Sequence, residues 1–233
     1  MEDRDAKITV VDLNNGAEVG AKEFRGGLVN NHPVGQQDVG YLVNQGIWGS
    51  GVDVFVTKIW DWKNGEEIVL FKGESDEGAI NRSFIDEHRG NIIASSVDYF
   101  QSPKQVTYIQ VLDKASNALI YATPKKAGQI HRFGLSPNGK FLALARGNGT
   151  VEIHDMYSLS MVWESEPEKI LGGGIRSLEF SPDGTMLLAV SGSNNVGLWE
   201  SATGKIITAD LKHKSSLAAA GWNERGNAFL TAS

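Results

Sequence analysis

The sequence contains no cysteine among its 233 residues, so disulfide bonds and cysteine-ligated metal sites are excluded. It also contains no apolar run that approaches the roughly 18 residues of a membrane-spanning helix. The charged residues 1–5 are unlike the start of a secretory signal peptide. We therefore predict an intracellular protein, cytoplasmic or nuclear, without a membrane partner.

An excess of basic charge is also missing. Lys and Arg together number 22, against 28 Asp and Glu, and the formal net charge is −6. A chain of this charge is repelled by the phosphates of nucleic acids and anionic membranes. The partners predicted from charge are other proteins or peptides, and not nucleic acid.

Patterns that carry catalysis are lacking as well. The five histidines occupy non-equivalent positions and show no spacing typical of a metal site. No Gly-x-Ser-x-Gly or P-loop pattern occurs. The sequence predicts no metal, no cofactor and no enzymatic activity.

Turn signals, by contrast, are abundant, and 27 glycines accompany them. Residues 175–207 contain four short apolar runs separated by three turns, of which the first is Ser-Pro-Asp-Gly at 181–184. There Pro182 favours φ near −65° and Gly184 tolerates positive φ. The stretch predicts four antiparallel strands that are too short to be stable without similar neighbours.

The pattern recurs along the chain. An acidic residue closes the third apolar run of each copy, and these residues are spaced 42–52 apart: Asp12, Asp61, Asp113, Asp155 and Glu200. This interval is typical of the four-stranded blades of β-propellers. Because a carboxylate before a tight turn can accept backbone N–H groups, we interpret Asp61, Asp155 and Glu200 as turn caps.

Ile59-Trp60-Asp61 and Leu198-Trp199-Glu200, with the turns at 136–139 and 181–184, resemble the WD-repeat β-propeller family with degenerate repeats. The resemblance gives Trp60 and Trp199 structural roles. In other blades a different side chain replaces the tryptophan: Val11, Leu112 and His154. We expect His154 to be partly buried at that position.

The resemblance also implies a buried hydrogen-bonded tetrad of His, Ser or Thr, Asp and Trp. His213, Thr231 and Asp5 match three positions of one such set, and Val11 stands where Trp belongs. We expect His213, Thr231 and Asp5 to be structural.

The predicted fold is an all-β, five-bladed propeller of four-stranded antiparallel blades in a single domain, residues 1–233. Residues 6–20 supply only the third and fourth strands of a blade. Residues 217–233 supply only the first and second strands of a blade. We expect these segments to pair and close the ring, which leaves no sheet edge exposed. The alternative is an open part of a seven-bladed propeller. The predicted blades are 217–233 plus 6–20, 24–71, 76–122, 128–164 and 173–210.

The resemblance implies a non-catalytic protein–protein interaction scaffold. The blades can be aligned on the glycine of the turn between their first and second strands. The residue eight positions before this glycine is cationic or titratable in three successive blades: Arg82, His131 and Arg176. With the adjacent Arg132, they are expected at the central mouth, where arginine suits a carboxylate or phosphate. An acidic or phosphorylated partner is predicted; the alternative is unrelated surface charges paired with nearby acids.

Two long loops, predicted at 46–51 and 99–104, carry aromatic residues, and loops on a rigid scaffold often bind partners. We predict that Trp48, Tyr99 and Phe100 contact the partner, or alternatively pack on neighbouring loops.

The alternative function is a glycoside hydrolase-like or small-metabolite-processing propeller. Sugar cleavage requires two carboxyl groups roughly 5–9.5 Å apart. The acids of the first strands, Asp86 and Glu179, fall late in their strands and are expected near the opposite face.

Overall fold

A computed structural model describes most of the chain. The described residues are 6–12, 14–24, 28–34, 40–47, 54–61, 65–74, 79–86, 89–98, 106–116, 118–124, 126–127, 129–166, 171, 174–208 and 213–233. The chain divides into two compact units, residues 1–125 and 126–233, and each is described by itself.

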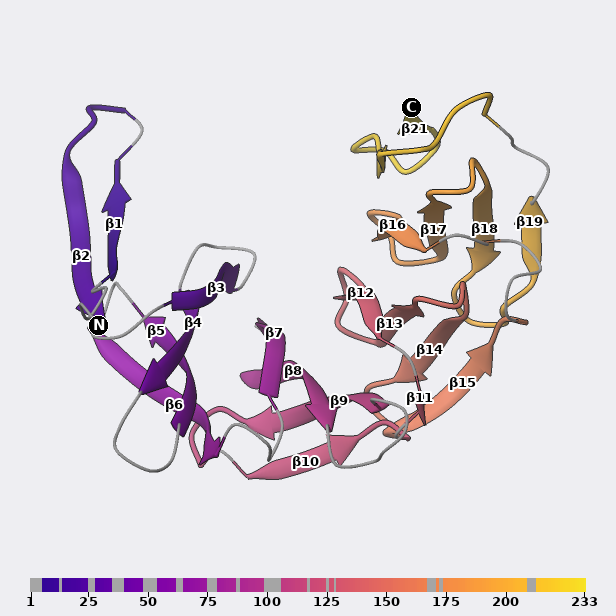
Figure 1. The fold of residues 1–233 in the computed structure, drawn as a ribbon. Helices are drawn as coiled ribbons and strands as arrows, with labels where there is room; N and C mark the ends of the chain where they lie inside the picture. Colours follow the sequence, from indigo (N-terminus) through magenta and orange to yellow (C-terminus); the bar gives the residue numbers. More distant parts are fainter. Residues whose placement is uncertain are drawn as a thin grey trace. The chain divides into compact units, whose positions relative to one another are not determined.

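In residues 1–125 the described elements are β-strands joined by turns. The strands are β1 (Ala6–Val11), β2 (Glu18–Phe24), β3 (Leu28–Val34), β4 (Gly40–Ile47), β5 (Val54–Asp61), β6 (Glu66–Glu74), β7 (Ala79–Asp86), β8 (Asn91–Asp98), β9 (Val106–Asp113) and β10 (Leu119–Ala122). Strands β1 and β2 form a two-stranded sheet, whereas β3 to β6 and β7 to β10 pair antiparallel in chain order (Figure 1).

Residues 126–233 repeat this plan. The strands are β11 (Lys126–Ala127), β12 (Ile130–Leu135), β13 (Phe141–Arg146), β14 (Val151–Asp155), β15 (Ser160–Glu164), β16 (Ile175–Phe180), β17 (Met186–Ser191), β18 (Val196–Glu200), β19 (Ile206–Thr208), β20 (Ala219–Trp222) and β21 (Phe229–Ala232). The strands β12 to β15 and β16 to β19 form four-stranded sheets, and β20 and β21 form a two-stranded sheet. Among the first strands of these sheets, β16 contacts both β12 and β20.

The first turns follow the chemistry that their sequence predicts. Ser181 Oγ donates to Asp183 Oδ1 at 2.6 Å and accepts a bond from the backbone N–H of Met186 at 2.9 Å. Gly184 has φ +72°, a conformation that a side chain disfavours. The turn at 136–139 is built in the same way, with Asn in place of Asp.

Side chains along β17 point alternately to the two faces of its sheet, and this explains how the sheets pack against each other. Successive side chains of a strand face opposite sides, so Leu187 and Ala189 join a core shared with β13 and β14. Leu188 and Val190 face the other way, into a core shared with β20 and β21. Every residue from Leu187 to Ser191 is therefore buried, and the sheet β16–β19 is covered on both faces.

The outer strands are far more exposed than these inner strands. Met161 and Val162 of β15 are exposed, as are Ile206 and Ile207 of β19 at the matching positions. Burial therefore decreases from the second and third strands to the fourth.

The prediction of an all-β fold with four-stranded antiparallel sheets is confirmed. The count of five blades and the closure of the ring stay predictions. One local expectation was wrong: Gly46 and Ile47 were assigned to a loop, but β4 extends through them because Ile47 still pairs with Val54. No helix long and apolar enough to cross a membrane occurs among the residues searched, which are those just given.

Candidate functional site

The first strands β12 and β16 each carry a bulge near their start. In β12, Ile130 pairs with Arg146 and Arg132 with the preceding residue of β13, so His131 is the extra residue. The register of β16 shifts in the same way around Arg176. A bulge re-aims the side chain of its extra residue. The structure thus gives His131 and Arg176 equivalent positions in neighbouring sheets.

The imidazole of His131 lies against two glycines. A Cβ atom on Gly147 would be 2.9 Å from His131 Nε2, and one on Gly174 would be 3.4 Å from His131 Cε1. Gly174 has φ +81° and leads directly into β16. Glycine at both positions therefore makes room for the ring between the end of β13 and the start of β16.

Arg132 joins the two bulges. Its Nη1 donates to the carbonyl oxygen of His131 at 2.7 Å, and its Nε donates to the carbonyl oxygen of Arg176 at 2.9 Å. These bonds tie β12 to β16 and hold the backbone of both bulged residues. Arg132, predicted to bind a partner, thus has structural contacts of its own.

Arg176 differs from Arg132 because its side chain is exposed. Its guanidinium makes no hydrogen bond or ion pair with any residue in the described part of the chain. The alternative that this cation is paired with a nearby acid finds no support among those residues.

Arg82 lies one residue away from the position that the glycine alignment gave it. In β7 the register shifts between Ile80 and Arg82, and Arg82 pairs with Ser95. The bulged residue there is Asn81, and Arg82 corresponds to Arg132. The alignment slipped because the turn after β7 has its glycine one position later than the Ser-Pro-Asn-Gly turn.

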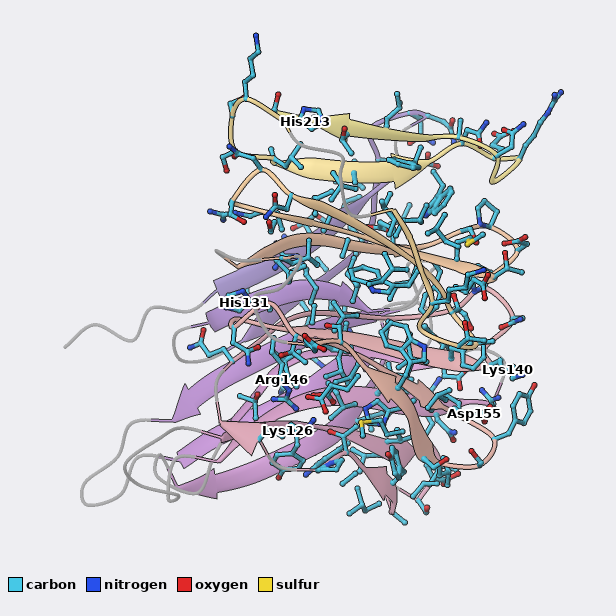
Figure 2. The ribbon with its side chains drawn as sticks, turned by 90° about the vertical axis from the view of Figure 1, so that its right-hand side faces the viewer. Lys126, His131, Lys140, Arg146, Asp155 and His213 are labelled. Atoms are coloured by element: carbon cyan, nitrogen blue, oxygen red, sulfur yellow. The ribbon has the colours of Figure 1, made fainter. Side chains whose placement is uncertain are left out.

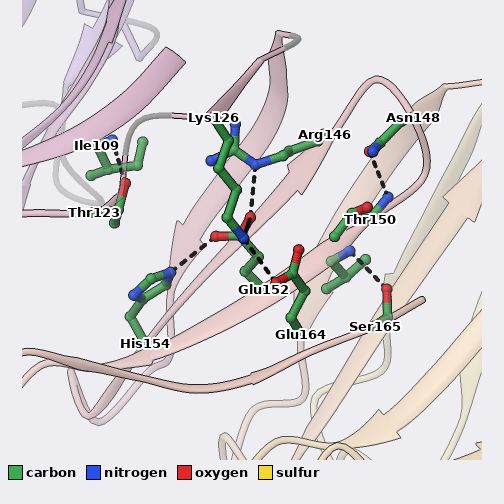
Figure 3. A network of polar contacts seen from close by, with 11 residues as sticks. Ile109, Thr123, Lys126, Arg146, Asn148, Thr150, Glu152, His154, Glu164 and Ser165 are labelled. Atoms are coloured by element: carbon green, nitrogen blue, oxygen red, sulfur yellow. Dashed lines mark hydrogen bonds and ion pairs between the residues drawn. The ribbon is translucent and has the colours of Figure 1, made fainter. Parts of the chain in front are cut away.

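A buried charge network lies beside the bulge of β12 (Figure 3). Glu152 is fully buried and receives a bond from Arg146 Nε at 2.7 Å; its other oxygen lies 3.2 Å from His154 Nε2. Lys126 Nζ lies 3.0 Å from Glu152 and 2.8 Å from Glu164. Two cations and the imidazole therefore surround one carboxylate.

The surroundings fix the ionisation of this carboxylate. Burial acts to raise the pKa of Glu152, but hydrogen bonds from His154 and Arg146 and the charge of Arg146 outweigh it. They lower the pKa to about 2. Burial lowers the pKa of Lys126, yet its bonds to Glu164 and Glu152 raise it overall. Both groups stay charged near neutral pH.

Sequence reasoning missed most of this network. It placed His154 at the tryptophan position, partly buried, whereas the structure buries the ring completely against Glu152. One signal was available: Glu152 and His154 stand two residues apart in an apolar strand and so face the same side. No local pattern connected them to Arg146 or Lys126.

The opposite end of the sheet carries the acidic turns. Asp155 Oδ1 accepts the backbone N–H groups of Tyr157 and Ser158 at 2.8 and 2.9 Å, as a turn cap requires. Burial acts to raise the pKa of Asp155, but these bonds lower it. Figure 2 shows Asp155 at the far end of the sheet from His131. Glu200 accepts a bond from the Thr203 hydroxyl at 2.9 Å.

The remaining structural predictions concern tryptophan and the tetrad. Trp60 and Trp199 are buried, with 3% and 1% of their surface exposed. His213 Nε2 lies 2.8 Å from Thr231 Oγ1, so the structure brings these two residues together. Val11 is exposed in β1.

Several predictions lie outside the described residues. These are Asp5, Trp48, Tyr99 and Phe100, together with the side chains of Arg82 and Asp61.

The two acids weighed for catalysis have other contacts. Asp86 is buried and paired with Arg89 at 3.1 Å. Burial raises the pKa of Glu179, which accepts a bond from Ser177 at 3.2 Å. Within the described ranges, no three metal-ligating side chains gather into a site.

A comparison with known protein families found one match, which covers part of the repeated sheets. Residues 158–225, from the turn before β15 to the turn after β20, match the family described as the anaphase-promoting complex subunit 4 WD40 domain. Residues 158–225 of the chain are therefore similar to a WD40 domain. The predicted resemblance to the WD-repeat family is therefore confirmed, and the match includes Trp199-Glu200. The search of curated proteins found no match to the chain.

Proposed function

We propose that the chain is a non-catalytic scaffold that binds another protein through its WD repeats. A fold alone does not specify a function, so the proposal needs a site. The observation that carries it is the pair of equivalent bulges that aim His131 and Arg176 from neighbouring first strands. The matched family is named for a subunit of a complex, which supports a role in an assembly.

The partner segment we propose is acidic or phosphorylated. Arg176 is exposed, and arginine binds carboxylates and phosphates through a planar pair of donors. His131 adds an N–H donor, and Arg132 holds the backbone that carries both. We also assign Arg82, Trp48, Tyr99 and Phe100 to partner contacts.

The test uses fluorescein-labelled peptides with phosphoserine in an Asp- and Glu-rich context, and matched peptides with serine or lysine. Arg176→Ala should weaken binding of the phosphorylated peptide about tenfold without changing the unfolding midpoint. Arg225→Ala is the matched control, because Arg225 is an exposed arginine in the turn between β20 and β21. Equal effects of the two substitutions would contradict the proposal.

We further propose that the chain forms five blades and that β1 and β2 complete the sheet of β20 and β21. Support comes from the two-stranded sheets, each of which is half of the four-stranded plan. If the register of β17 and β18 is repeated, Leu230 lies opposite Val10.

Because the native chain lacks cysteine, an introduced pair can form only one intramolecular disulfide. Leu230→Cys with Val10→Cys should cross-link on mild oxidation, as seen by non-reducing electrophoresis. The pair Leu230→Cys with Val19→Cys is the control, since Val19 lies on the outer strand β2. Failure of the first pair to cross-link would favour the open arrangement. Neither result depends on the anionic-peptide site.

A further inference from the structure

The first strand β16 is an edge strand with two exposed side chains. In the described part of the chain β16 pairs only with β17, and Figure 1 shows it with β12 on one side of residues 126–233, opposite β15 and β19. Both faces of its sheet are covered, so a side chain of β16 reaches solvent along the free edge. The two exposed residues of β16 are Arg176 and Glu179. The edge therefore presents one cation and one carboxylate.

The carboxylate of Glu179 has no cationic partner in the part of the chain that the structure describes. The Ser177 hydroxyl donates to Glu179 Oε1 at 3.2 Å, and no ion pair reaches Glu179 from the described residues. Trp222 Nε1 donates to the backbone carbonyl oxygen of Glu179 at 3.2 Å and fixes the strand there. Burial raises the pKa of Glu179, and the bond from Ser177 only partly offsets this effect. A cation supplied by a ligand would therefore stabilise the ionised carboxylate.

Glycines on both neighbouring first strands leave room beside Glu179. Gly134 of β12 and Gly221 of β20 occupy the position of Glu179, one residue before the last pair of their hairpins. A Cβ atom added at either glycine would meet nothing within 4 Å. Because β16 contacts both β12 and β20, these open positions lie on the two strands that flank Glu179.

Basic and acidic groups lie at different ends of the first strands. The strands β12, β16 and β20 carry four charged or titratable side chains: His131, Arg132, Arg176 and Glu179. The three basic groups gather at the bulges, because Arg132 bonds to the backbone of both bulged residues. Glu179 is the one acid of these three strands, and it lies near the other end of β16.

The spacing of the two exposed charges matches that of an extended peptide. In the register with β17, the bulged Arg176 lies between the levels of Ser191 and Val190, and Glu179 lies level with Leu188. The two positions are therefore about 8 Å apart along β16. In an extended segment, side chains two residues apart face the same way and lie about 7 Å apart.

We propose that the free edge of β16 recognises a partner segment that carries two opposite charges, an acidic or phosphorylated residue at Arg176 and a lysine or arginine two residues away at Glu179. This inference rests on the proposed function, because it keeps the anionic residue at Arg176, and it adds a basic residue to the partner's motif. Arg176 donates to the anion through its planar fork. Glu179 accepts hydrogen bonds from the cation, which enters beside the flanking glycines.

The probe is a labelled peptide with one phosphoserine and with lysines two residues before and two residues after it. Either chain direction then presents a lysine to Glu179. The matched peptide has the same composition and charge, but its lysines stand five residues from the phosphoserine. Fluorescence anisotropy at low salt measures both affinities. The wild-type protein should bind the first peptide about fivefold more tightly than the second.

Removal of the carboxylate should abolish this preference. Glu179→Gln should weaken the first peptide about fivefold and leave the second unchanged. The unfolding midpoint should not fall, because burial disfavours the charge that is removed. Glu224→Gln is the matched control and should keep the preference, because Glu224 is an exposed acid in the turn between β20 and β21.

A charge reversal gives an independent check. Two further peptides carry glutamate in place of lysine, at two or at five residues from the phosphoserine. Glu179→Lys should bind the closely spaced glutamate peptide more tightly than the widely spaced one, and the wild type should not show this preference. Lack of the preference in Glu179→Lys would count against the contact at Glu179.

Arg176→Ala separates this inference from the proposed function. If the substitution weakens both lysine peptides, but lysine spacing has no effect on the wild type, the proposed function holds and the two-charge motif is overturned. The motif is also overturned if Glu179→Gln keeps the spacing preference. If Arg176→Ala weakens neither peptide, or if no phosphorylated peptide binds the wild type up to about 1 mM, both proposals fail.

Discussion

The third strands β14 and β18 have the same backbone position in neighbouring sheets but are filled by different chemistry. In β18 the indole of Trp199 lies over Gly197, where an added Cβ would collide with the ring. In β14 the matching residues are His154 and Glu152, which lie 3.2 Å apart. The residue at the end of the second strand differs too.

That residue is Ser191 in β17 and Arg146 in β13, and the two positions are equivalent because Ile175 pairs with Ser191 and Ile130 pairs with Arg146. One sheet thus fills the position with a tryptophan above a glycine, and the other with a charged network. The two sheets therefore have in common a filled volume at this position, and not one particular residue. Substitutions in the charged network and at the tryptophan should therefore change the free energy of unfolding by different amounts.

Removal of the central carboxylate should have the largest effect. Glu152→Ala leaves Arg146 buried without its charge partner, and it should lower the free energy of unfolding by about 3–5 kcal/mol. Denaturant unfolding followed by circular dichroism measures this loss. A loss below about 1 kcal/mol would show that the network contributes little.

A triple substitution sharpens the comparison. Arg146→Ser, Glu152→Gly and His154→Trp together copy Ser191, Gly197 and Trp199 into the other sheet. The triple variant should recover most of the stability lost in Glu152→Ala, because no buried charge is left without a partner.

Acid should weaken the charged sheet through Glu152. Its folded pKa of about 2 lies below the ordinary value of 4.5, so it stabilises the fold fully above pH 4.5. This contribution is lost as pH falls from 4.5 through about 2, and a shift of this size corresponds to about 3 kcal/mol. Unfolding measured across this range should show a steeper decline for the wild type than for Glu152→Gln.

Gly197→Ala should have the next largest effect, in the sheet with tryptophan. The added methyl group collides with Trp199 and should cost about 1–3 kcal/mol. Gly221→Ala is a matched control, because nothing lies within 4 Å of the position of its added Cβ. Thermal unfolding of both variants should separate them, and equal losses would contradict the close contact.

Glu164→Gln should have the smallest effect. Glu164 binds the same Lys126 as Glu152 does, but its side chain is 36% exposed. Water screens such a pair, and the expected loss is below about 1 kcal/mol. A double-mutant cycle with Lys126→Met measures the coupling, and a coupling as large as that of Glu152 would contradict this ranking.

The sequence predicted the features that depend on neighbouring residues. Turns such as 181–184 form from the serine, proline, acid and glycine that stand there, so their positions and their strands could be read directly. The alternation in β17 and the burial of Trp199 follow from the same local patterns.

Features that join distant residues could not be predicted in this way. Arg82 was misaligned because the turn glycine moved by one residue while the strand register did not. The link from Lys126 to Glu152 and Glu164 depends on segments about 26 and 38 residues apart, which no periodicity connects.

Trp163 of β15 sits where two neighbouring sheets touch. Its indole N–H donates to the carbonyl oxygen of Ser201 at 2.8 Å, its ring lies against Gly204, and its centroid is 6.2 Å from that of Trp199. Two indoles this close couple their electronic transitions and produce a paired band in the far-ultraviolet spectrum. The intensity of this paired band therefore reports whether the two neighbouring sheets remain packed together, and the measurement needs no attached label.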